Sequence, residues 1–72
     1  MKNTPLFPYL MDYYTKHVVE LIMQNHYFSK EDATKLFKDS NTYKKLENEE
    51  IEMNDLPYQI VYKMWVDEKG FL

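Results

Sequence analysis

The 72-residue chain has no cysteine and no arginine, and its single glycine is Gly70. Without cysteine there are no disulfides and no thiolate metal sites, and we expect a reducing, cytoplasmic environment. Without arginine, the chain lacks the side chain that usually clamps a phosphate or carboxylate through two parallel hydrogen bonds. A β-domain of this length normally needs several glycines in its turns, so one glycine near the end favours an all-α fold.

Long hydrophobic runs are also missing. No uncharged segment approaches the roughly 20 apolar residues of a membrane helix, and the opening NTPLFPYLM is too short and proline-rich for a signal peptide. We expect a single domain, residues 1–72, that buries only about 60% of its unfolded surface. The net charge is −3, because residues 1–46 have seven lysines and five acids, whereas residues 47–72 have two lysines and seven acids.

The sequence predicts a compact bundle of three main helices with a short extra helical turn. The first helix runs from about Pro8 to Asn25, and its apolar side is broad enough to predict neighbours on two sides. One polar stripe interrupts that apolar side, and it consists of Asp12, Lys16, Glu20 and Gln24. The second helix opens at Ser29, which with Asp32 forms a variant of the Ser-x-x-Glu capping box. Its inward side chains are Ala33, Leu36 and Phe37.

A polar break, Asp39-Ser40-Asn41, separates the second helix from a short helical segment that contains Tyr43 and Leu46. Ser40 or Asn41 is expected to cap this segment. An acidic connector follows from Glu47 to Asp55, with a brief extended stretch around Ile51 and Met53. The last helix is predicted to begin near Asp55 to Pro57 and to end before Gly70, because glycine favours the position just past a helix.

Residues that carry catalytic chemistry are sparse. Nucleophilic catalysis needs a hydroxyl or thiol held against a base, but the only serines, Ser29 and Ser40, both have the spacing of helix caps. His17 and Glu20 lie three residues apart and can reach one metal ion, although their neighbours are poor ligands. His26 lies just past the first helix, where an imidazole commonly satisfies last-turn carbonyl groups. We therefore expect no enzyme, no metal and no other cofactor.

DNA binding is the alternative function. The break at 39–41 has the length of a helix-turn-helix corner, and the segment 40–46 would present Tyr43, Lys44 and Lys45. Affinity for DNA comes mainly from neutralising phosphates, and the available lysines are Lys30, Lys35, Lys38, Lys44 and Lys45. Acids interleave with these lysines and follow them directly, and no arginine is present to read guanine. A small DNA-binding regulator is thus ranked second, and we do not expect nucleic acid as the partner.

Aromatic side chains are in excess. The chain has seven tyrosines, four phenylalanines and one tryptophan, with five methionines, which is more than a small helical core encloses comfortably. Tyrosine and tryptophan are typical anchors of protein interfaces, although tyrosines can also close a core with their hydroxyls in water. On the last helix we expect Ile60, Val61 and Met64 to face the core. The predicted contact residues for another protein or a second copy are Tyr43, Lys44, Tyr58, Tyr62 and Trp65.

The segments FSKEDATKLFKDSNTYKKLENEE and LPYQIVYKMWVDE resemble a group of small bacterial helical proteins of unknown function. The shared pattern is a first helix, Ser-x-x-Glu-Ala, an apolar pair, Ser-x-Thr-Tyr-x-x-Leu, an acidic loop and a last helix ending in acids. The likeness covers about residues 10–68, and Asp32 stands where the pattern has glutamate. Such proteins are often encoded beside toxin-like genes, including ADP-ribosyltransferase-like ones. The resemblance therefore implies an antitoxin-like or accessory partner in a bacterial or phage system.

Overall fold

The computed structural model describes residues 7–48 and 56–70, with side chains from residue 9 onward. These residues form four helices, α1 Phe7–His26, α2 Lys30–Lys38, α3 Asn41–Glu47 and α4 Tyr58–Lys69. The predicted all-α fold is confirmed, and α3 is the short extra segment after Ser40. The expected extended stretch at Ile51 and Met53 lies outside the described residues. Within the described part of the chain, no helix has both the length and the apolarity needed to cross a membrane.

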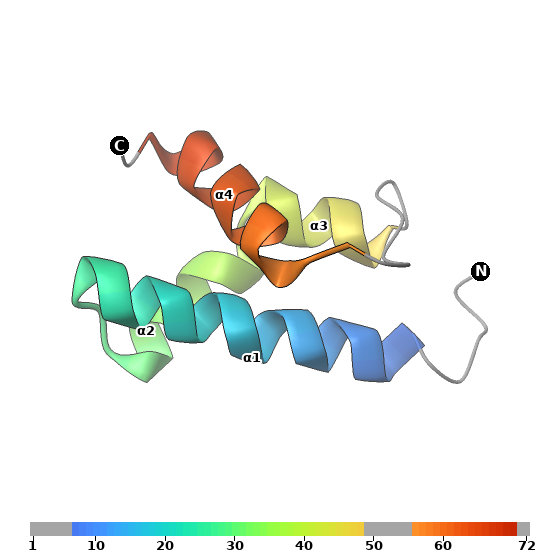
Figure 1. Cartoon of the computed structure of the whole chain (residues 1–72), viewed down its shortest axis with the longest axis horizontal. Helices are drawn as coiled ribbons and strands as arrows, with labels where there is room; N and C mark the ends of the chain where they lie inside the picture. Colours follow the sequence, from blue (N-terminus) through green and yellow to red (C-terminus); the bar gives the residue numbers. More distant parts are fainter. Residues whose placement is uncertain (1–6, 49–55, 71–72) are drawn as a thin grey trace.

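The long helix α1 is central. It runs the length of the described bundle, with α2 folded back beside it and α4 crossing above it, next to α3 (Figure 1). α1 therefore has neighbours on two sides, as its broad apolar surface predicts. The hydroxyl of Tyr14 donates to the carbonyl oxygen of Leu56 and so ties the chain entering α4 to α1.

The helix ends follow from local side chains. The amide of Asp32 donates to Ser29 Oγ over 3.1 Å, and the amide of Tyr43 donates to Ser40 Oγ over the same distance. Each hydroxyl satisfies one of the amides that have no partner inside the first turn of a helix. At the other end of α4, Gly70 has a φ of 76° and its amide donates to the carbonyl oxygen of Val66 over 2.9 Å. The predicted serine caps and the glycine stop are confirmed.

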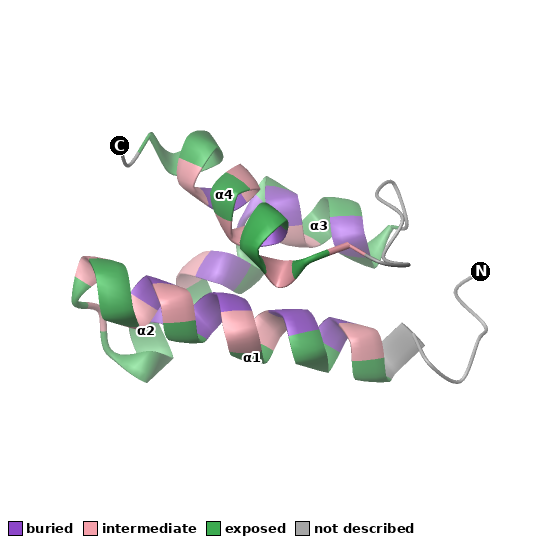
Figure 2. Ribbon diagram, viewed as in Figure 1, coloured by how far each residue is buried: buried purple, intermediate pink, exposed green. Residues whose placement is uncertain are grey.

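The core contains apolar side chains from all four helices. Figure 2 shows the buried positions of α1 along the edge that faces α4. The buried apolar side chains are Met11, Tyr14, Val18, Val19, Ile22, Ala33, Phe37, Leu46, Val61 and Trp65. Two polar residues, Ser40 and Thr42, are buried with them at the start of α3.

The predicted orientation of α4 is partly wrong. Val61 faces the core as expected, but Trp65 is fully buried and Ile60 is 45% exposed. Val61 and Trp65 lie one turn apart and share a stripe, whereas Ile60 lies about 100° around the helix from Val61. α4 packs against α1 on one flank and α3 on the other, and this orientation removes the largest apolar side chain from water. Trp65 is therefore part of the core rather than an open contact residue.

Candidate interaction surface

Tyrosine and histidine rings line the contact between α1 and α4. Tyr13 and His17 lie one turn apart on α1, and their ring centroids are 4.6 Å apart in an edge-on arrangement. The ring of Tyr58, at the start of α4, stacks on His17 with a centroid separation of 4.5 Å and an interplanar angle of 19°. Glu20 Oε1, about one turn farther along α1, lies 3.5 Å from His17 Nδ1. The imidazole is thus held by groups from both helices.

A second histidine–tyrosine pair lies farther along the same helices. His26 Nε2 and the hydroxyl of Tyr62 are 2.9 Å apart and share a hydrogen bond whose donor depends on the histidine tautomer. The Tyr62 ring is nearly parallel to that of Trp65, with centroids 6.3 Å apart. His26 was expected only to satisfy carbonyl groups at the end of its own helix, so its contact with α4 is a feature that sequence reasoning missed.

These five side chains, Tyr13, His17, His26, Tyr58 and Tyr62, are called the aromatic seam below. Tyr13 is 46% exposed, and the other four are partly buried. The seam includes two of the predicted contact residues, Tyr58 and Tyr62. Both rings are fixed by intramolecular contacts and still present a surface to solvent, and the buried Trp65 lies next to Tyr62 and His26.

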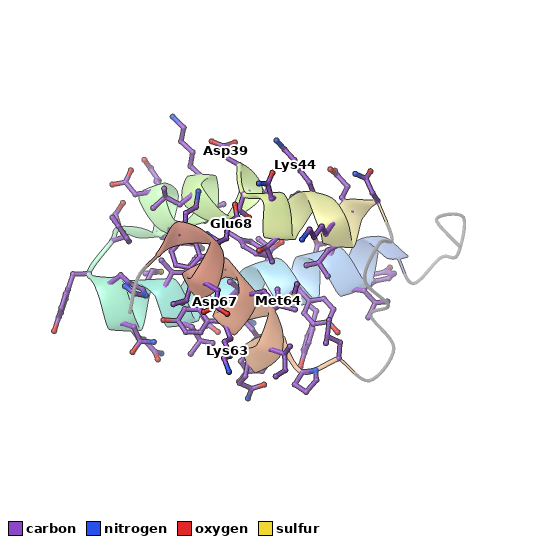
Figure 3. All side chains as sticks on the ribbon, turned by 90° about the horizontal axis from the view of Figure 1, so that it is seen from above. Asp39, Lys44, Lys63, Met64, Asp67 and Glu68 are labelled. Atoms are coloured by element: carbon purple, nitrogen blue, oxygen red, sulfur yellow. The ribbon has the colours of Figure 1, made fainter. Side chains whose placement is uncertain are left out.

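The other two predicted contact residues lie elsewhere. Tyr43 packs edge-on against Phe37 with a centroid distance of 5.3 Å. Burial raises the pKa of the Tyr43 phenol, and the negative charges of Glu47 and Asp12 raise it further. Lys44 is exposed on α3 (Figure 3). The predicted surface therefore divides into the aromatic seam and a separate site on α3.

The start of α3 is occupied by a carboxylate. Glu68, near the end of α4, accepts hydrogen bonds of 2.8 Å from the amides of Asn41 and Thr42 and from the Thr42 hydroxyl (Figure 3). Partial burial alone would raise the pKa of the Glu68 carboxyl, but these hydrogen bonds and the charge of Lys69 outweigh it and lower the pKa. Glu68 thus caps a helix that is distant in sequence.

Both serines of the chain lie in the described part, and both are engaged as helix caps. The hydroxyl of Ser40 donates to the carbonyl oxygen of Phe37 while it accepts from the Tyr43 amide, so it is engaged as a cap. Ser29 is likewise a cap. Across residues 7–48 and 56–70, no three His, Cys, Asp or Glu side chains are grouped so that they could hold a metal ion.

A hollow on the described surface lies between α1 and α2. It has a volume of about 420 Å³, with Val19 and Met23 at its apolar part and Asp12, Lys16, Glu20 and Lys30 among its charged lining. The predicted polar stripe of α1 therefore borders a groove. Comparisons of this chain with protein-family models, with curated proteins and with solved structures found no match.

Proposed function

We propose that this protein is a non-enzymatic protein-interaction module that binds another protein through the aromatic seam. The observation that carries the proposal is the arrangement of Tyr58 and Tyr62, which are partly exposed and fixed by His17 and His26. Aromatic side chains dominate the binding energy of many interfaces. Rings that are already ordered lose little conformational freedom on binding, so more of their contact energy contributes to affinity.

The resemblance implies an antitoxin-like role, and this role suggests which class of protein is the partner. We expect the bound protein to be encoded close to this chain, as a toxin-like protein or another component of the same system. The engagement of Ser29 and Ser40 as helix caps supports a binding role over a catalytic one.

The experiment is affinity capture from the organism that encodes the protein, with tagged wild type and two matched variants. Tyr58→Ala removes a ring of the aromatic seam, and Lys63→Ala changes an exposed residue of the same helix. We expect one protein to be retained by wild type and Lys63→Ala and to be lost with Tyr58→Ala, while circular dichroism shows that both variants stay folded. Equal retention by all three proteins would refute binding through the seam.

DNA binding by the segment 40–46 remains the second candidate, because α2 and α3 form a tight corner with exposed lysines. Recognition helices contact base edges mainly through their first residues. In this protein the carboxylate of Glu68 lies at the start of α3, which places negative charge where DNA would approach. A duplex affinity that falls steeply between about 50 and 200 mM salt would favour this alternative over protein binding.

A further inference from the structure

The side of α1 that faces solvent has a regular pattern of its own. Six residues follow one another at spacings of four, three, four, three and four: Tyr9, Tyr13, Lys16, Glu20, Met23 and Tyr27. This is the spacing of the a and d positions through which helices pair in coiled coils. We call these residues the outer face of α1, although Tyr27 is the first residue past the end of the helix. Figure 2 shows exposed positions along the edge of α1 that points away from α4.

The outer face is unusually aromatic for a surface. Tyr9 is 72% exposed, Tyr13 46% and Tyr27 94%. A tyrosine presents about 200 Å², so these three rings leave about 400 Å² uncovered on one copy. The stems of Lys16 and Glu20 and the partly buried Met23 extend that area.

Tyr27 is also exceptional in its backbone. It follows the last residue of α1 with a φ of 60°, in the left-handed region that favours glycine or asparagine. A bulky aromatic residue held in this conformation, with its ring almost fully in water, contributes little to the monomer fold. Such an outlier points to a role outside the monomer.

The outer face is complementary to itself. In an antiparallel pair of α1 helices related by a two-fold axis at the level of Val18, Lys16 of one copy lies opposite Glu20 of the other, and the contact occurs twice. The same register places Tyr13 opposite Met23, also twice, and brings Tyr9 of each copy to the end of α1 in the other copy, next to Tyr27. Met23 lines the 420 Å³ groove between α1 and α2, which offers space beside the helix for a tyrosine ring of the second copy.

We propose that the chain forms an antiparallel two-fold dimer through the outer face of α1. A two-fold interface uses the same patch on both copies. The outer face meets this requirement because its lysine and its glutamate lie at equal distances on either side of the axis and its aromatic residues lie toward the two ends. The three rings supply about 800 Å² over the two copies, and the side chains of Lys16, Glu20 and Met23 bring the total near the lower end for specific interfaces, about 1,200 Å². Weak, transient complexes are common at this size, so we expect a reversible dimer with a Kd in the micromolar range. It leaves Tyr58 and Tyr62 uncovered but uses Tyr13, whose ring centroid lies 6.1 Å from that of Tyr58, so the dimer interface adjoins the aromatic seam at this residue.

The test is sedimentation velocity of the purified full chain over about 10 to 300 µM. Wild type should change from monomer to dimer across this range. Lys16→Glu and Glu20→Lys should each weaken association at least about tenfold, because each replaces two attractive contacts by two repulsive ones. Both residues are exposed, so the variants should remain folded, and circular dichroism melts check this.

Mixing the two variants gives the decisive result. A chain with glutamate at 16 and 20 should pair with a chain with lysine at 16 and 20, because the antiparallel register restores both contacts. The mixture should therefore associate at least as tightly as wild type, although neither variant associates alone. Lys63→Glu, which makes the same charge change on α4, should leave the dimer unaffected.

A wild type that stays monomeric throughout the range would overturn the proposal. A wild-type dimer that tolerates both substitutions, or a mixture that associates no better than its components, would overturn this interface and register. These measurements use only the pure protein, so their failure leaves the capture experiment with Tyr58→Ala undecided, and failure of that experiment does not affect the dimer.

Discussion

The contact between Glu68 and the start of α3 allows a quantitative prediction. The carboxylate accepts from two backbone amides and from the hydroxyl of Thr42, and Thr42 is only 3% exposed. The Tyr43 amide is satisfied by Ser40 Oγ. Glu68 therefore supplies the partners for the first two amides of α3 and joins α4 to it. Removing this side chain should weaken both the short helix and its packing against α4.

The expected loss follows from helix-cap energetics. Replacing a capping side chain by alanine costs about 0.5–2 kcal/mol. Glu68 satisfies three donors, but water replaces part of this bonding because the residue is exposed, so we expect Glu68→Ala to lower the free energy of unfolding by about 1.5 kcal/mol. Glu68→Gln keeps an acceptor but removes the charge at the positive end of the helix, so about 1 kcal/mol or less should be lost.

The effect should depend on pH. The pKa of Glu68 in the folded state is lowered from its ordinary value of 4.5, so the ionised carboxylate stabilises the fold at neutral pH. This contribution is complete above the unfolded-state pKa and is lost as the pH falls from about 4.5 through the lower, folded-state value. The difference in unfolding free energy between wild type and Glu68→Gln should therefore shrink on acidification.

Urea denaturation followed by circular dichroism, at low micromolar protein to avoid association, measures these differences. A loss of 1.5 kcal/mol should also lower the melting temperature by roughly 6 to 12 °C. Asp67→Asn is the matched control, since it removes a neighbouring exposed charge and should change stability by less than about 0.5 kcal/mol. If Glu68→Ala matches this control, or if the difference persists unchanged at low pH, the capping account is wrong.

Three further changes test the fold. Ser29→Ala should lower the unfolding free energy by about 1 kcal/mol through loss of the α2 cap, and a change within error in urea melts would contradict it. Trp65→Ala should destabilise by about 3–5 kcal/mol because it empties a fully buried site; a mild effect in the same assay would argue against the buried position. Tyr27→Gly should stabilise the monomer by roughly 1 kcal/mol by relieving the left-handed backbone, and thermal melts at low protein concentration should show a rise, not a fall.

The local structure of this protein was accessible from the sequence because its determinants are close together in the chain. Ser29 and Ser40 each bind an amide three residues ahead, and Gly70 adopts a backbone conformation that glycine favours by itself. The breadth of the apolar side of α1 indicated a central helix for a similar reason, since the helical repeat brings its residues onto shared stripes. The all-α fold and the helix boundaries followed from these signals.

The relative placement of the helices was decided only by tertiary structure. Two apolar stripes on α4 were compatible with its sequence, and packing against α1 and α3 selected the one with Val61 and Trp65, leaving Ile60 exposed. The hydrogen bond between Thr42 and Glu68 joins residues that are 26 positions apart in the sequence. The hydrogen bond between His26 and Tyr62 joins residues that are 36 positions apart. The sequence around each of these residues does not indicate which distant residue it will contact, because such contacts depend on how whole helices pack. The aromatic seam exists for the same reason, since neither α1 nor α4 contains it alone.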